Sequence, residues 1–163
     1  MVDRATMAID RVMHRRLSWA ALWLLGCACL LAVLPGHAQD DGKPFAEAHV
    51  LLQVSDADPV KQAAAIDIAN NLMKHYGGPD TVDIEILAFG PGIDLYRADN
   101  PLRPRLESLL PSGVRLVVCK NTLDTLERTT GAAPQLIDGL IYVQTGVARI
   151  VERVGQGFVL VKP

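Results

Sequence analysis

The chain has 163 residues, which fits one domain of ordinary size behind a short leading segment. Its formal net charge is −2 at pH 7, and no long run of like charges interrupts it, so nucleic acid is excluded as an expected partner. Residues 1–38 hold four of the 16 Lys+Arg and two of the 18 Asp+Glu, so the remainder carries a net charge of about −4.

The N-terminal segment has the three parts of an export signal. Arg15-Arg16 precede an apolar run over residues 17–34, and Pro35-Gly36 ends that run. Gly36 and Ala38 then place small residues at positions −3 and −1 of a cleavage site. This order predicts a signal peptide over 1–38 that is cleaved after about Ala38, a flexible leader over 39–47, a domain over 48–163 and a periplasmic location.

Other interpretations of the segment remain open. The apolar run is just long enough to span a bilayer, so an uncleaved anchor would be the protein's one contact with a membrane. Leu24-Leu25-Gly26-Cys27 loosely resembles a lipoprotein cleavage box, although the apolar run continues beyond it. The Arg15-Arg16 pair also suggests twin-arginine export, but its flanking residues fit poorly. Translation can start at Met1, Met7 or Met13.

The first predicted strand and helix follow the leader. His49–Val54 is a short apolar run of strand length. Asp58 is a suitable N-cap and Pro59 suits the first helical position, so a helix is expected from there to about His75. Gly77-Gly78 should end it. Its expected apolar face repeats every four residues, at Ala64, Ile68 and Leu72.

The rest of the chain continues the alternation of strands and helices. Val82–Phe89 alternates and then becomes fully apolar, as a strand with a buried far end does. Gly90-Pro91-Gly92 is interpreted as a tight turn. The later predicted elements are a helix over Pro101–Leu110 that begins near Pro104, a strand over Val114–Val118, a short helix near Leu123–Thr129, and strands over Leu140–Val143 and Phe158–Val161.

A last helix, closed by Gly155, is predicted between these two strands. Its apolar stripe consists of Val147, Ile150, Val151 and Val154, and Arg149, Glu152 and Arg153 are expected outside the stripe.

Apolar strands joined by helices predict a three-layer α/β/α fold with a mostly parallel five-stranded sheet. Right-handed crossovers place every strand-to-helix turn at one edge of such a sheet, where ligands bind. Residues 55–58, 89–93, 119–122 and 144–146 should therefore meet there. The first turn, Ser55–Asp58, has no glycine and two carboxylates, which disfavours dinucleotide binding.

Cys119 is the most informative candidate residue. Cys27 and Cys29 lie in the predicted signal, so Cys119 is the one thiol of the exported protein. It follows a strand and precedes Asn121-Thr122, either of which suits the N-cap of the next helix. A helix N-terminus stabilises thiolate, the form that attacks sulfur or carries an extra sulfur atom. The competing interpretation is a small buried residue without reactivity.

No partner for Cys119 is evident among the histidines. His49 begins the first strand, at the edge opposite Cys119, and His75 lies at the end of the first helix. A Cys–His nucleophilic pair, a metal site and a cofactor site are therefore not expected. Asp56 and Asp58 form a possible acid–base pair, although turn and capping roles explain them more simply.

The segments HVLLQVSDADPVKQAAAIDIANNLMKHYG, VDIEILAFGPGIDLY, SGVRLVVCKNTL and TGVARIVERVGQGFVLVKP together resemble the DsrE/DsrF-like family, in its exported, signal-bearing branch. The resemblance implies a five-stranded parallel sheet and a tendency to form homo-oligomers. It also implies sulfur relay, because cytoplasmic relatives pass persulfide sulfur between cysteines of partner proteins. Cys119 lies where several relatives carry their cysteine. Lys120, Asn121 and Thr122 stand where some relatives have a second cysteine, so a partner's thiol would have to resolve a persulfide.

These observations favour an exported sulfur carrier that acts through Cys119 and hands sulfur to a thiol- or sulfur-bearing protein partner, without turnover of its own. The first alternative is a non-catalytic binding or assembly subunit in which Cys119 is structural. A third class is a small-molecule enzyme that uses Asp56, Asp58 and the Gly90–Gly92 turn.

Overall fold

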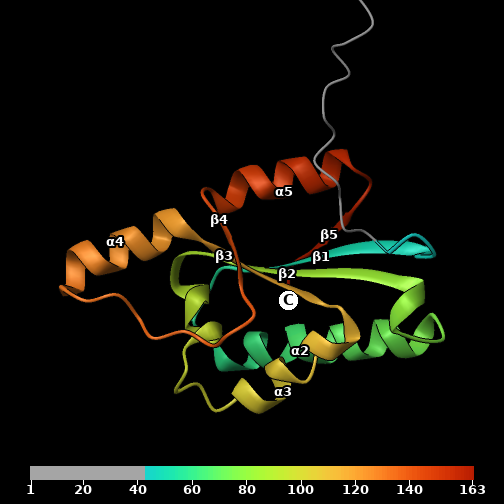
Figure 1. The fold of residues 1–163 in the computed structure, drawn as a ribbon, viewed down its shortest axis with the longest axis horizontal. Coiled ribbons are helices and arrows are strands. Elements are labelled where there is room, and N and C mark those ends of the chain that lie inside the picture. Colours follow the sequence, from blue (N-terminus) through green and yellow to red (C-terminus); the bar gives the residue numbers. More distant parts are fainter. Residues whose placement is uncertain (1–42) are drawn as a thin grey trace, which may run out of the picture. The chain divides into compact units, whose positions relative to one another are not determined.

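The structure, a computed structural model, describes residues 43–163. Five parallel strands form one sheet in the order β4-β3-β2-β1-β5. Helices cover both faces of the sheet, so the predicted α/β fold is confirmed (Figure 1). The strands are β1 (Ala48–Val54), β2 (Val82–Ala88), β3 (Arg115–Cys119), β4 (Ile141–Val143) and β5 (Val159–Val161), and the helices are α2 (Pro59–His75), α3 (Arg103–Glu107), α4 (Lys120–Thr130) and α5 (Gly146–Gly155), with short 3-10 helices η2 (Pro79–Thr81), η3 (Gly90–Tyr96) and η4 (Leu110–Ser112).

The strand order decides how the helices are distributed over the two faces. The chain steps in one direction from β1 to β4 and then returns across the whole sheet to β5. Because parallel crossovers are right-handed, the stepwise connections share one face and the return connection crosses the other. Figure 1 shows α2 and α3 beneath the sheet and α5 above it. Leu123 and Leu126 of α4 pack on the same core as α2. One ten-residue helix therefore covers the second face.

The α2 helix turns to the core a face that is shifted from the predicted one, with Ile68 and Leu72 packed at its margin. Its N-cap is Asp58, whose carboxylate accepts the Val60 amide at 2.8 Å, as expected. The predicted apolar residues Ala64, Ile68 and Leu72 are only partly buried. The buried face instead carries Gln62, Ala65, Ile66 and Ala69. The amide of Gln62 is satisfied there by the carbonyl of Asp56 at 3.4 Å and by Asn100 at 3.3 Å, which removes the cost of burying it.

The α5 helix is oriented opposite to its predicted stripe. Val147, Val151 and Val154 are 55%, 69% and 47% exposed, whereas Arg153 is 3% exposed. Arg149 also faces the sheet, where its side chain is 21% exposed. The expectation that the arginines lie outside and the valines inside is therefore wrong. Its physical reason is a pair of buried carboxylates on β2, which require positive charge from the covering helix.

The predicted signal falls outside the described residues. Among residues 43–163, no helix is long and apolar enough to cross a membrane. The described part of the predicted leader contacts the domain: the Lys43 ammonium donates to the carbonyl of Ser112 at 2.8 Å and to that of Pro79. Burial lowers the pKa of Lys43, and nearby Asp83 partly opposes this shift. The Glu47 amide donates to the Thr81 carbonyl at 2.8 Å.

The Gly90-Pro91-Gly92 segment begins the 3-10 helix η3 and is not the tight turn that the sequence suggests. The helix crosses close under the end of β1, where the Phe89 amide donates to the Val54 carbonyl at 3.2 Å. A β-carbon on Gly92 would lie 2.2 Å from that carbonyl oxygen. Only glycine fits at this position, because a β-carbon would collide with backbone atoms of Val54 and Ser55, which cannot turn aside as a side chain can.

Substitution of Gly92 by alanine is expected to lower the free energy of unfolding by more than about 2 kcal/mol, because backbone must shift to admit the methyl group. Gly155→Ala is the matched control, since its β-carbon meets nothing within 4 Å, and it should change the stability by less than about 1 kcal/mol. Urea denaturation followed by circular dichroism measures both. Equal stability of the two variants would contradict this account.

Candidate functional site

Cys119 ends β3 and is itself the N-cap of α4, with extended backbone angles of φ −81° and ψ 115°. The expectation that Asn121 or Thr122 caps this helix is therefore wrong. The helix begins earlier than predicted, at Lys120, because the chain turns directly from the last strand residue into the helix. This places Asn121 and Thr122 in the first turn, where their backbone amides point back toward Cys119.

The sulfur of Cys119 also lies at the start of a second helix. Sγ accepts the amide proton of Gly146, the first residue of α5, at 3.2 Å. As a thiol, the same sulfur donates to the carbonyl of Gln144 at 3.8 Å. Two helices of ten and eleven residues thus direct their N-termini at one atom. The positive ends of both dipoles favour a negative charge on that sulfur.

Gly146 permits this approach because it has no side chain. A β-carbon there would lie 3.2 Å from Cβ of Cys119 and 3.3 Å from Cβ of Phe89, both tighter than ordinary contact. A larger residue would push the Gly146 amide away from the sulfur. Gly146, in the segment 144–146 that was predicted to lie at this edge, is therefore part of the site, although its contact with the sulfur was not predicted.

Hydrogen bonds to the sulfur outweigh the cost of its burial. Burial raises the pKa of the Cys119 thiol. The Gly146 amide, the hydroxyl and amide of Thr122 and the amide of Asn121 act in the opposite direction, and the net result is a lowered pKa. The Thr122 oxygen accepts the Gly90 amide at 3.1 Å, which leaves its own proton for the sulfur. The site therefore favours thiolate.

The thiol is close to the surface but covered. Cys119 is 5% exposed, and an exposed polar rim surrounds it. In this rim the Gln144 amide donates to the Asn121 side chain at 2.6 Å, and Asn121 donates to the Thr145 hydroxyl at 3.1 Å. A reagent that attacks the sulfur must therefore displace part of the cover first.

The segments predicted to share this edge do meet: Gly90 contacts Thr122, Gly146 contacts Cys119, and Gly92 lies close to the backbone of Ser55. The carboxylates of the first turn have other partners. Asp56 pairs with Lys61 at 2.7 Å, and Asp58 caps α2. Their turn and capping roles are thus accounted for.

The two described histidines lie apart from the thiol, as the sequence indicates. His49 is 3.4 Å from the carboxylate of Asp83 and packs against the ring of Phe158, with 5.2 Å between centroids. His75 contacts the ring of Tyr76 at the end of α2. In residues 43–163 no group of three or more His, Cys, Asp or Glu side chains is arranged to hold a metal ion.

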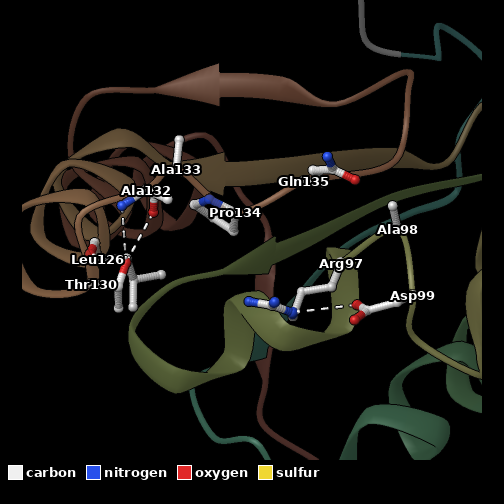
Figure 2. A pocket seen from close by; sticks show the side chains of 9 residues that line it. All are labelled: Arg97, Ala98, Asp99, Leu126, Thr130, Ala132, Ala133, Pro134 and Gln135. Atoms are coloured by element: carbon white, nitrogen blue, oxygen red, sulfur yellow. Dashed lines mark hydrogen bonds and ion pairs between the residues drawn. The ribbon is translucent and has the colours of Figure 1, made fainter.

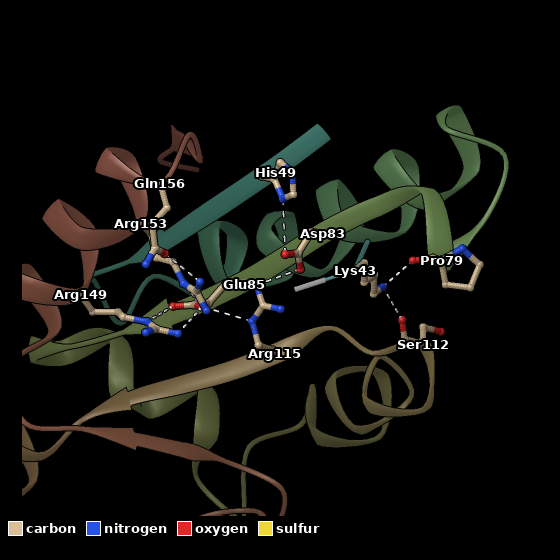
Figure 3. A network of polar contacts seen from close by, with 10 residues as sticks. All are labelled: Lys43, His49, Pro79, Asp83, Glu85, Ser112, Arg115, Arg149, Arg153 and Gln156. Carbon is tan, nitrogen blue, oxygen red and sulfur yellow. Dashed lines mark hydrogen bonds and ion pairs between the residues drawn. The ribbon is translucent and has the colours of Figure 1, made fainter. Parts of the chain in front are cut away.

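A buried charged network on the α5 side of the sheet was missed by sequence analysis (Figure 3). Asp83 and Glu85 of β2 are fully buried. Glu85 accepts from Arg149 at 2.9 and 3.0 Å, from Arg153 at 2.9 Å and from Arg115 at 3.3 Å. Arg115 also lies 2.8 Å from Asp83, at an angle outside hydrogen-bond geometry. The sequence did carry a signal for this network: the alternating residues of Val82–Phe89 place two carboxylates in a central strand, where both faces are covered and the carboxylates need positively charged partners.

A separate cavity of about 510 Å³ opens near the C-terminal end of α4 (Figure 2). Its polar lining includes Arg97, which pairs with Asp99 at 3.4 Å, and Thr130, whose hydroxyl donates to the carbonyls of Leu126 and Ala132. Neither Cys119 nor the two first-turn carboxylates lines it. The cavity therefore does not extend the thiol site.

Comparison with known proteins supports the fold. No protein-family model and no curated protein matches the sequence. The chain is similar in structure to a protein of unknown function, MTH1491 from Methanobacterium thermoautotrophicum, with 28% identity, a TM-score of 0.63, and coverage of 72% of this chain and 100% of that one. A second protein of unknown function, BT1422 from Bacteroides thetaiotaomicron, matches at 14% identity and a TM-score of 0.48 over 71% of this chain and 94% of its own.

The Thr122→Val substitution is expected to raise the pKa of the Cys119 thiol, because it removes one hydrogen bond to the charged form. The wild-type thiolate should form below the ordinary thiol range, and the variant thiolate at higher pH. Ultraviolet absorbance of the thiolate, titrated against pH, reports this without requiring access to the sulfur. Thr122→Ser, which keeps the hydroxyl, should titrate like wild type; identical curves for all three would refute the role of Thr122.

Proposed function

We propose that this protein is an exported, periplasmic sulfur carrier that holds a persulfide on Cys119 and passes the sulfur to a thiol-bearing protein partner. One observation carries the proposal: two helix N-termini and a hydroxyl converge on a single sulfur whose pKa is lowered. The resemblance to the DsrE/DsrF-like family supports the same chemistry. The proposal includes no turnover of a substrate by the protein alone.

The transfer needs only thiolates and sulfur–sulfur bonds. The Cys119 thiolate attacks the outer sulfur of a donor persulfide, a new S–S bond forms, and the donor's S–S bond breaks to release a donor thiolate, which takes up a proton. A partner thiolate then attacks the outer sulfur on Cys119 and receives it, and the Cys119 thiolate is restored. The outer sulfur keeps the same oxidation state throughout the transfer, so no external oxidant or reductant is needed. The amides of Gly146 and Thr122 stabilise the anionic sulfur before and after each exchange.

The alternative is a binding or assembly subunit in which Cys119 is structural. The 5% exposure of Cys119 favours this alternative, since buried cysteines are often inert. The lowered pKa favours the carrier, because an inert core thiol gains nothing from donors to its charged form.

Exposure of the purified protein to inorganic polysulfide, followed by intact-mass analysis, should show a gain of about 32 Da, one sulfur atom. The gain should disappear after treatment with a thiol reductant and should be absent in Cys119→Ser. The predicted exported form has no other cysteine, so the assignment needs no mapping. An unmodified wild-type protein would remove the carrier and leave the binding role.

We also propose that the outer surface of α5 contacts a second copy of this chain. The register of the sheet places Leu160 and Ile141 on the α5 face, beside Leu51 and Val117, and they are 42% and 40% exposed. With the α5 valines they form an apolar surface, and a parallel sheet requires cover on both faces.

A second copy fits this surface better than the chain's own leader. Cleavage after Ala38 would leave residues 39–42 ahead of the domain, which reach at most about 14 Å when extended. Lys43 is held by Ser112 and Pro79 at the edge where the strands begin. The α5 helix runs from Cys119, where β3 ends, back toward that edge, so its first part, with Val147, lies farthest from the leader. A two-fold contact between identical faces is the commonest way in which such surfaces are closed.

Light scattering of wild type should therefore give an oligomer mass, and Val151→Lys should shift it to the monomer, because the new charge would be buried in the interface. Val60→Lys is the matched control: Val60 is 75% exposed on α2, so its substitution should leave the oligomer intact. A wild-type protein that stays monomeric at high concentration would contradict the proposed contact.

A further inference from the structure

Besides the polar rim, the first turn of α5 covers the Cys119 sulfur. Gly146 lies against both the sulfur and the ring-bearing side chain of Phe89. The α5 helix is the whole of the return crossover between β4 and β5, and no other helix of the described residues crosses this face. Reaction at the sulfur, with Cys119 only 5% exposed, therefore depends on how firmly α5 is held to the sheet.

The α5 helix is held mainly by charge. Its contacts with the sheet include a two-pronged bond from Arg149 to both oxygens of Glu85, at 2.9 and 3.0 Å, and a bond from Arg153 at 2.9 Å (Figure 3). Ile150 is the α5 side chain that joins the small apolar cluster on this face. The other large apolar side chains of α5, its three valines, are turned outward and contribute little to its attachment.

The other face of the sheet is built differently. There α2 contributes Ala65, Ile66 and Ala69, all fully buried, to the large apolar core. Apolar contacts of this kind are spread over many atoms and are not released by the loss of one group. The attachment of α5, in contrast, includes three hydrogen bonds from two arginines to one carboxylate, and removal of that single buried partner breaks all three.

We propose that Glu85 is a positioning residue for Cys119: through Arg149 and Arg153 it holds α5, and with it the Gly146 amide, against the sulfur, and release of these ion pairs uncovers the thiol. Glu85 touches no reacting atom. Its carboxylate sets both the access to the sulfur and the distance of one donor that stabilises the thiolate. The inference rests on the proposed function only in that Cys119 is the reacting group.

The test is the rate at which Cys119 of the folded protein reacts with iodoacetamide at neutral pH. Glu85→Gln keeps the size of the side chain and removes its charge, and the reaction should be at least tenfold faster than in wild type. Arg149→Gln, in which Arg153 still binds Glu85, should give an intermediate rate, and Arg149→Lys a rate nearer to wild type. Glu107→Gln is the matched control, because it breaks the exposed pair with Arg103 at 2.7 Å, away from α5.

Two further measurements distinguish release of α5 from general instability. Amide hydrogen exchange should accelerate over residues 146–155 in Glu85→Gln while α2 stays protected. The alkylation rate should depend on urea much less steeply than global unfolding does, because opening of one helix exposes little surface. Unchanged alkylation in Glu85→Gln and Arg149→Gln, or acceleration with the full urea dependence of unfolding, would overturn the inference.

The outcomes also separate this inference from the carrier function. A sulfur adduct on wild type together with unchanged alkylation in the variants would remove the role of Glu85 and leave the carrier. Faster alkylation in the variants without any sulfur adduct would remove the carrier and leave α5 as the cover that Glu85 holds in place.

Discussion

The strand order imposes the constraint on which the rest of this molecule depends. A chain that steps from β1 to β4 and returns to β5 must send its last crossover over the face that the other helices do not occupy. That face is covered by one ten-residue helix, which is too narrow to cover a sheet of five strands. The apolar cluster beneath it is small, with four buried members: Leu51, Leu87, Val117 and Phe158. Charged side chains occupy the area between this cluster and α5's arginines, and Leu160 and Ile141 on the outer strands stay partly exposed.

Buried charge on this face is tolerable because it is almost fully paired. Glu85 accepts hydrogen bonds from three guanidinium groups, and the guanidinium groups of Arg115 and Arg153 lie 5.7 and 4.8 Å from the ring centre of Phe158. An apolar replacement of the network would hold α5 at least as firmly. What the charges add is orientation: a two-pronged bond to a fixed carboxylate allows one rotation of the helix, with Arg149 and Arg153 inward and the valines outward.

The sequence was sufficient for the elements but not for the faces that they present. Strand and helix positions follow from apolar runs and from punctuation such as Asp58-Pro59 and Gly77-Gly78, which act locally. The face of a helix is decided by what lies opposite it. The α5 stripe was assigned to the core because valines are usually inside, and the rule failed because the opposing strand carries Glu85. Likewise Gln62 is buried in α2 only because Asp56 and Asn100 satisfy its amide.

The candidate site was predictable to the same extent. Cys119 was identified from its place after an apolar strand, which is local information. The meeting of residues 144–146 with residues 119–122 was predicted from the fold, but the Gly146 amide as a donor to the sulfur was not, because that contact depends on where α5 begins. This difference bears on the chemistry. A thiol stabilised by its own helix alone would stay a thiolate whatever α5 does, whereas this one takes part of its stabilisation from Gly146. Displacement of α5 therefore exposes the sulfur and removes one of its donors in the same movement. Loss of this donor raises the pKa of the thiol and makes the ionised sulfur a stronger nucleophile, so the proposed movement exchanges part of the thiolate stabilisation for access and nucleophilicity.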